Sequence, residues 1–320
     1  MESNSIHFYQ DDLKILSECR ICPRNCGVNR FISANGWCRT GAGYSIASIG
    51  PHYGEEPIIS GKNGICNIFF SHCNLQCIFC QNHQISDNQL VISQNEQDIH
   101  AVIERIFLFL EEGCHAVGFV SPSHVVPHVK TIIKILKKQG VKSAFVYNSN
   151  GYDSVESLKS LEGLIDIYLP DFKYLDPSLA SSYSGAADYP EMASLAILEM
   201  YRQKGSTLIT DEEGQALSGL IIRHLVLPGH VENSKKILRF IAEELSPRVH
   251  VSLMSQYYPV YKAIGHTVLG RELFKDEYQE IIDEMDRLGL FKGWIQNLES
   301  SSYYLPDFKK DNPFESWDLP

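Results

Sequence analysis

The spacing of the cysteines constrains this chain more than any other feature of its sequence. All nine cysteines lie within the first 114 residues, and all but Cys114 lie between Cys19 and Cys80. The opening residues lack the apolar stretch of a secretory leader, and no run of about 18 apolar residues could span a membrane. We therefore expect a cytoplasmic protein in a reducing compartment, where clustered cysteines bind metal more often than they form disulfides.

The overall composition is that of a globular protein with an acidic surface. The chain has 320 residues, of which 44% are apolar and 21% charged, and its formal net charge is −11. Such a composition excludes disorder and collagen-like repetition. Because the charge is negative, the sequence predicts neither a nucleic-acid partner nor an anionic membrane partner.

Short apolar runs alternate with amphipathic segments after about residue 64, and this alternation predicts parallel βαβ units. Six units are expected, two short of an eight-fold barrel, so a partial (βα)6 TIM-like barrel of α/β class or an open doubly wound sheet fits. In both cases the loops after the strands carry the chemistry. The predicted strands are Ile65–Phe70, Ala116–Val120, Ser143–Tyr147, Ile165–Leu169, Leu220–Val226 and Val249–Met254.

The helices are predicted from apolar residues that recur three and four positions apart. Ile99, Val102, Ile103 and Ile106 share one face of a predicted helix. Further helices are predicted over 129–136, 190–204, 232–244 and 278–288, an inserted hairpin over 206–217, and an extended tail over 300–320. We expect a cysteine-rich metal-binding lobe over 1–60, the barrel over 61–270, and a helix, a strand and the tail over 271–320.

A first group of cysteines follows the first predicted barrel strand in the segment SHCNLQCIFCQN. Cys73, Cys77 and Cys80 have the spacing C-x3-C-x2-C. Three thiolates on one tight loop can hold a cubane [4Fe–4S] cluster and leave one iron open to a substrate or cofactor. The alternative is a zinc site that Cys66 or His83 completes.

A second group of cysteines lies upstream, with the spacing C-x2-C-x3-C-x11-C. Four thiolates complete a tetrahedral zinc site or an auxiliary [4Fe–4S] cluster, and both remain open here, with a structural role expected. We expect the two cysteines outside both groups, Cys66 and Cys114, to be buried packing residues. The four ligands of this second site are Cys19, Cys22, Cys26 and Cys38.

The three-cysteine loop, with Phe79 before its last cysteine, resembles that of the radical S-adenosylmethionine superfamily. This resemblance implies a [4Fe–4S] cluster whose open iron binds S-adenosyl-L-methionine and whose electron cleaves it to a 5′-deoxyadenosyl radical. The later strand ends resemble the branch typified by pyruvate formate-lyase activating enzyme. The resemblance implies that cofactor-binding residues are Phe79, Asn148, Asp171, Lys173 and Arg223.

One segment departs from the superfamily pattern. After the second strand the superfamily usually has a Gly-Gly-Glu-like stretch that holds the amino group of the cofactor, whereas this chain has GFVSPSHVVP. Ser121 and Ser123 are candidates for that contact, and His124 is a candidate catalytic acid or a helix cap. This variation, with the flanks CPRNCGVNR and GEEPIISG, resembles a subgroup of pyruvate formate-lyase activating enzyme-like iron–sulfur proteins.

The resemblance implies an oxidoreductase that most closely matches a glycyl-radical-enzyme activase. Its expected partners are a flavodoxin or ferredoxin as reductant and a glycyl-radical enzyme or other protein as substrate. Two alternatives remain at this point: a radical enzyme that modifies another peptide or a small molecule, and a non-catalytic iron–sulfur scaffold or sensor.

Overall fold

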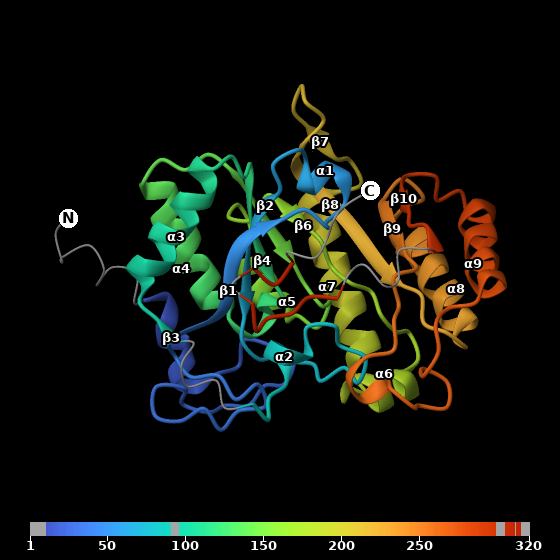
Figure 1. Cartoon of the computed structure of the whole chain (residues 1–320), viewed down its shortest axis with the longest axis horizontal. Helices are drawn as coiled ribbons and strands as arrows, with labels where there is room; N and C mark the ends of the chain where they lie inside the picture. The colour runs from blue at the N-terminus through green and yellow to red at the C-terminus, as the bar shows by residue number, and fades with distance from the viewer. Residues whose placement is uncertain (1–10, 91–95, 299–304, 311, 315–320) are drawn as a thin grey trace.

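A computed structural model describes residues 11–90, 96–298, 305–310 and 312–314. In these ranges the strands form one ten-stranded sheet with the order β10-β9-β8-β6-β5-β4-β2-β1-β3, and β7 pairs with β8 (Figure 1). The strands are β1 (Tyr44–His52), β2 (Ile65–Phe70), β3 (Glu96–Gln97), β4 (Ala116–Val120), β5 (Ala144–Asn148), β6 (Ile167–Tyr168), β7 (Ile209–Thr210), β8 (Ala216–Leu225), β9 (His250–Met254) and β10 (Gly293–Ile295).

The centre of the sheet is parallel and confirms the predicted partial barrel. The strands β2, β4, β5, β6, β8 and β9 pair in parallel in that order and correspond to the six predicted strands. The path of paired strands has two ends, at β10 and β3, so the barrel is open. Since parallel strands share one direction, the segments after β2, β4, β5 and β6 emerge at the same edge.

The longer helices lie along the outside of the sheet, with α3 and α4 beside β1 and β4, and α8 and α9 beside β9 and β10 (Figure 1). The helices of the described ranges are α1 (Pro57–Ser60), α2 (His83–Ser86), α3 (Ile99–Glu111), α4 (Val126–Lys138), α5 (Val155–Ser160), α6 (Pro177–Ser184), α7 (Tyr189–Lys204), α8 (Val231–Phe240) and α9 (Lys275–Arg287). Short 3-10 turns occupy Asp12–Glu18, Pro122–His124 and Tyr261–Ala263, and a π-helical turn, Ile241–Leu245, extends α8. None of the helices in the described ranges is long and apolar enough to cross a membrane.

The helix α3 shows why the periodic pattern predicted its position. The Asp98 side chain accepts a hydrogen bond from the backbone of His100 and caps the helix. Val102, Ile103 and Ile106 are buried on the face that packs against the sheet. The predicted helical face is therefore confirmed, since apolar residues three and four positions apart lie on one side of a helix.

The inner face of the barrel has an apolar floor and a polar layer above it. Ile59 of α1 packs in the floor with inward residues of the strands, among them Ile65, Ala116, Ile167 and Ile221. One step further along β2 and β4, Asn67 pairs with Gly118. A Cβ atom at Gly118 would lie 1.9 Å from Oδ1 of Asn67, so only glycine leaves room for that side chain.

The N-terminal lobe leads into a strand that the sequence did not predict. Backbone hydrogen bonds join Cys19 to Val28, and β1 then pairs antiparallel with β2. The predicted hairpin is present as β7 and β8, and the predicted C-terminal helix and strand are present as α9 and β10. Of the predicted tail, 305–310 and 312–314 are described, and Phe308 and Phe314 pack on Phe69 of β2; the rest lies outside the described residues.

Candidate functional site

The three-cysteine loop directly follows β2 and is surrounded by hydrogen-bond donors. Nδ2 of Asn150 lies 3.2 Å from Sγ of Cys73, and the hydroxyls of Ser184 and Ser86 lie 3.0 Å and 3.2 Å from the sulfurs of Cys77 and Cys80. Hydrogen bonds to sulfur tune iron–sulfur clusters. The donors around this loop therefore fit the thiolates of a cluster.

Burial and mutual repulsion control the protonation of these thiols. Burial raises the pKa of Cys73 to about 12 and that of Cys80 to about 11, and the neighbouring thiolate charge of Cys77 adds to both increases. Burial also raises the pKa of Cys77, although the Lys173 ammonium opposes it. The charge of Cys77 thus acts on both of the other thiols. A bound metal cluster would stabilise the thiolate forms that burial disfavours.

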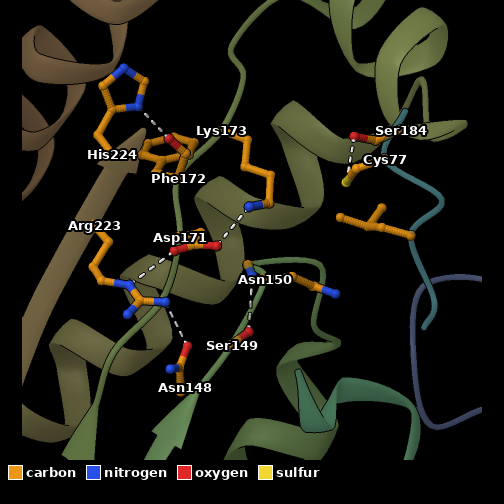
Figure 2. Close-up of polar contacts among 12 residues, drawn as sticks. Cys77, Asn148, Ser149, Asn150, Asp171, Phe172, Lys173, Ser184, Arg223 and His224 are labelled. Carbon is orange, nitrogen blue, oxygen red and sulfur yellow. Dashed lines mark hydrogen bonds and ion pairs between the residues drawn. The ribbon is translucent and has the colours of Figure 1, made fainter. Parts of the chain in front are cut away.

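A network of charged side chains crosses the barrel beside this loop, at the ends of the middle strands (Figure 2). Nζ of Lys173 lies 2.6 Å from Oδ2 of Asp171, and Nε of Arg223 lies 3.1 Å from Oδ1 of the same carboxylate. Nη2 of Arg223 donates to Oδ1 of Asn148 at 2.8 Å. The structure therefore brings together four of the residues that the sequence predicted as cofactor contacts.

The charges in this network are held in their ionised forms. Burial alone would raise the pKa of Asp171, but the Lys173 and Arg223 cations outweigh it and lower that pKa. Burial would lower the pKa of Lys173, but the charges of Asp171 and Cys77 raise it. Lys173 thus links the network to the cysteine loop electrostatically. A network that keeps both signs ionised offers partners of both charges to a zwitterionic group such as an amino-acid moiety.

Two acidic residues that the sequence interpretation missed complete the network. Oε2 of Glu55 lies 2.8 Å from Nη1 of Arg223, and its Oε1 accepts hydrogen bonds from Asn67 at 2.9 Å and Asn148 at 3.0 Å. Glu56 is also buried and interacts with Arg223. In the sequence these residues are two adjacent acids between Gly54 and Pro57, in the segment GEEPIISG. That segment contributed to the family resemblance, but no role was predicted for its two acids.

The residues that replace the Gly-Gly-Glu stretch make structural contacts in this geometry. The backbone of Ser121, at φ +49°, donates to the carbonyl of Asn148 at 2.8 Å. Nε2 of His124 lies 3.0 Å from the carbonyl oxygen of Ser71, and burial lowers the pKa of His124 to about 3, so the imidazole is neutral. Ser123 is buried beside the Tyr147 and Asp153 pair. The roles of Ser121, Ser123 and His124 remain predictions.

Phe79 is buried within the cysteine loop, and its ring centroid lies 5.9 Å from that of Tyr257. Cys66 and Cys114, which the sequence assigned to packing, are both buried. The role of Phe79 beside the cofactor also remains a prediction.

The four upstream cysteines line one small cavity of about 10 Å³ in the N-terminal lobe. Burial and the neighbouring thiolate charges of Cys38, Cys19 and Cys26 raise the pKa of Cys22 to about 12. The backbone of Trp37 donates to Sγ of Cys26 at 3.4 Å. Within the described ranges, however, no group of three or more His, Cys, Asp or Glu side chains stands as the ligand set of a metal ion. Both metal assignments therefore remain predictions.

The lobe and the three-cysteine loop are joined by one amide side chain. Nδ2 of Asn88 donates to the carbonyl oxygens of Trp37 at 2.8 Å and Cys73 at 2.9 Å, and its Oδ1 accepts from the backbone of Cys73 at 3.1 Å. The guanidinium of Arg24 adds a second connection, because its Nε donates to the carbonyl of Asn74 at 2.9 Å. Hydrogen bonds therefore link the segments that carry the two cysteine groups.

Comparisons with solved structures give distant similarities. They include a domain of pyruvate-formate lyase-activating enzyme from Bacteroides vulgatus (16% identity, 54% of this chain and 93% of that chain, TM-score 0.38). They also include Streptococcus suis SuiB bound to precursor peptide SuiA (14% identity, 74% of this chain and 49% of that chain, TM-score 0.47). A third is HydG, a maturase of the [FeFe]-hydrogenase (11% identity, 69% of this chain and 48% of that chain, TM-score 0.45). This chain spans about half the length of the latter two. At such identities and TM-scores these likenesses bear on neither its activity nor its substrate.

A curated relative gives a closer match. No family model matches the sequence. The chain is 31% identical over 284 residues to the uncharacterized protein MJ0674 of Methanocaldococcus jannaschii, a match that covers 86% of this chain and 76% of that protein. Identity at this level over most of both chains shows that the protein belongs to the same family as MJ0674.

Proposed function

We propose that this protein is a radical S-adenosylmethionine enzyme with Cys73, Cys77 and Cys80 as the ligands of a [4Fe–4S] cluster. The observation that carries the proposal is the position of the cysteine loop after β2, next to a buried network of paired charges at the ends of the neighbouring strands. Bound together, the cluster and S-adenosylmethionine supply reductive cleavage to a 5′-deoxyadenosyl radical, which abstracts hydrogen from the substrate.

The residues of the chain have separate tasks in this proposal. Asn150, Ser184 and Ser86 donate hydrogen bonds toward the cysteine sulfurs. Lys173 and Arg223 present positive charge to a carboxylate of the cofactor, and Asp171 holds both cations in place. Because these side chains are largely buried, water is kept from the site at which a radical would form.

The proposal is tested by anaerobic reconstitution with iron and sulfide, reduction with dithionite, and chromatographic detection of 5′-deoxyadenosine from S-adenosylmethionine. Wild type and Cys114→Ala are expected to form the product, because Cys114 is a buried packing residue outside the loop. Cys77→Ala is expected to lose both the cluster absorbance and the product. The proposal fails if wild type with a reduced cluster forms no 5′-deoxyadenosine.

In its finer form, we propose an activase that abstracts hydrogen from a glycine of a partner protein, with a flavodoxin or ferredoxin as reductant. The support for this form is the set of strand-end residues Asn148, Asp171, Lys173 and Arg223, whose pattern resembles activating enzymes. Electron paramagnetic resonance after incubation with candidate glycyl-radical enzymes should show a persistent glycyl doublet. Its absence with every partner, while 5′-deoxyadenosine still forms, would favour modification of another peptide or a small molecule.

For the four-cysteine lobe we propose a structural zinc site. The support is the size of the cavity that the four cysteines line, about 10 Å³, which is about the volume of a single water probe. A single ion fits such a space more readily than a cubane of four irons.

A further inference from the structure

Four buried charged groups meet inside the barrel, and their charges balance. Arg223 and Lys173 are the two cations of the network, and Glu55 and Asp171 are the two carboxylates that pair with them. These four groups therefore sum to zero. Glu56 is a third carboxyl group beside the same arginine, whose charge it shares with Glu55 and Asp171.

The position of Glu56 is fixed by its backbone. Its carbonyl oxygen accepts hydrogen bonds from the backbone of Ile59 at 2.7 Å and Ser60 at 2.9 Å, and Pro57 begins α1 directly after it. A residue held at the start of a short helix loses little further freedom when it binds a ligand. The backbone from which the Glu56 side chain projects is thus held in place.

The carboxyl group of Glu56 reaches the barrel interior with one oxygen free. The Ser252 hydroxyl of β9 hydrogen-bonds to this carboxyl group, and Ser252 pairs in the sheet with Arg223 of β8. Glu56 is only 8% exposed, and its Oε2 has no hydrogen-bond partner in the described structure. Buried polar oxygens are nearly always hydrogen-bonded in native proteins. An orphaned one beside a network of buried charges indicates a place for a ligand group.

The neighbours of Glu56 determine which kind of ligand it lacks. Burial raises its pKa, the charge of Glu55 raises it further, and Arg223 opposes both. Arg223 is bonded to Glu55, Asp171 and Asn148, so Glu56 shares the charge of this one cation with two other carboxylates. A positively charged group would ionise Glu56 and bond to its free oxygen.

We propose that Glu56 binds a positively charged amino or guanidino group of the substrate. This inference rests on the proposed function, since it assigns a substrate class to the barrel of the radical enzyme. It predicts a substrate, whether a protein side chain or a small molecule, that carries an ammonium or guanidinium group near the carbon that loses hydrogen. The charge of that group would complete the balance of the interior.

The test is calorimetric binding of n-butylammonium and methylguanidinium to the cluster-loaded protein, with n-butanol as the neutral comparison. Both cations are expected to bind wild type, and n-butanol at least tenfold more weakly. Glu56→Gln, whose amide has the shape of a protonated carboxyl group, is expected to fold normally and to bind the cations at least tenfold more weakly. Glu213→Gln, at an exposed position on the β7–β8 hairpin, is the matched control and should bind like wild type.

Three results would overturn the inference: neither cation binds wild type, n-butanol binds equally well, or Glu56→Gln binds the cations as tightly as wild type does. If circular dichroism shows that Glu56→Gln does not fold, Glu56→Asp is used instead. This variant is expected to bind the two cations, but more weakly than wild type does. Weaker binding of the cations by a folded Glu56→Asp variant would support the role of the carboxyl group at the reach of glutamate, and unchanged binding would overturn it. No S-adenosylmethionine is cleaved in these measurements, so a failure of the radical chemistry appears only in the separate 5′-deoxyadenosine assay.

Discussion

Arg223 is held in place by residues that reach it from distant parts of the chain. Glu55 comes from the loop after β1, Asn148 from the end of β5, and Asp171 from the segment after β6. Each contact uses a different guanidinium nitrogen, and such a fork geometry is available to arginine but not to lysine. The orientation of Arg223 therefore depends on the packing around each of its partners.

The first prediction concerns Gly118, which makes room for one of those partners. In Gly118→Ala the new methyl group would lie 1.9 Å from Oδ1 of Asn67, so Asn67 must move and lose its hydrogen bond to Glu55. We expect a loss of about 1–3 kcal/mol in the free energy of unfolding, measured with urea. Gly50→Ala in β1 is the control, because no atom lies within 4 Å of its added methyl group. Equal stability of the two variants would contradict this account.

For single residues, the sequence predicted the site residues that lie on or after the parallel strands. It missed the site residues that come from a turn elsewhere in the chain. Asp171, Lys173 and Arg223 could be predicted because they occur where parallel strands end, and such ends meet at one edge. Glu55 and Glu56 lie in a turn between Gly54 and Pro57, where adjacent acids usually face solvent. Their burial depends on Arg223, some 168 residues away, and no local pattern contains that contact.

Single side chains also connect whole elements, and the second prediction concerns the connection between α9 and the loop after β8. Glu277 of α9 accepts from the backbone of Gly229 at 2.7 Å and pairs with Arg271, and the hydrogen bond from Arg271 lowers the pKa of Glu277 to about 2. A lowered pKa stabilises the fold above the ordinary pKa near 4.5, and this stabilisation is lost as pH falls toward 2.

Glu277→Gln is therefore expected to lower the free energy of unfolding at pH 7 by on the order of 1 kcal/mol, after allowance for solvent screening. The difference from wild type should shrink when unfolding is measured between pH 5 and about pH 3. Glu280→Gln is the control on the same helix, since Glu280 is 54% exposed. A difference that stays constant with pH would show that Glu277 acts through packing rather than charge.

The third prediction concerns the junction between the N-terminal lobe and the cysteine loop. Asn88→Ala removes the amide that bonds to the backbones of Trp37 and Cys73. Leaving such groups without partners costs about 1–3 kcal/mol. We expect faster amide hydrogen exchange in residues 36–41 and 73–77 of the variant, while Asn35→Ala, at an exposed position of the lobe, should exchange like wild type. Unchanged exchange in Asn88→Ala would show that the lobe is held by other contacts.

The elements differ in how well their sequences predicted them. The parallel strands were predicted closely because they are buried on both faces and therefore appear as continuous apolar runs such as ICNIFF. β1 was missed because its sequence, YSIASIGPH, contains Gly50 and Pro51, and because its burial is partial and follows no regular alternation. The helix α6 was missed because half of its residues, in PSLASSYS, are serines, and its stability comes from the Asp176 cap and from packing.

The molecule contains two cysteine groups in different parts of the chain. The three-cysteine loop follows a barrel strand, whereas the four-cysteine group lies in a lobe whose apolar core, in the part from residue 11 onward, consists of Leu16, Cys19 and Ile21 with a few neighbours. Such a small core rarely supplies enough stability alone, so a bound metal would contribute directly to folding of the lobe. The barrel has a large continuous core and does not depend on its cluster in this way.

The last prediction follows from this division of roles. Protein purified without oxygen should contain about four irons and about one zinc per chain, measured by plasma emission spectroscopy. Cys22→Ser should lose the zinc and melt at a lower temperature while it retains its iron, and Cys77→Ala should lose the iron and retain the zinc. Cys114→Ala is the control that keeps both metals. About eight irons without zinc would instead identify the lobe as the site of an auxiliary cluster, and joint loss of both metals in Cys22→Ser would show that the lobe and the barrel fold as one unit.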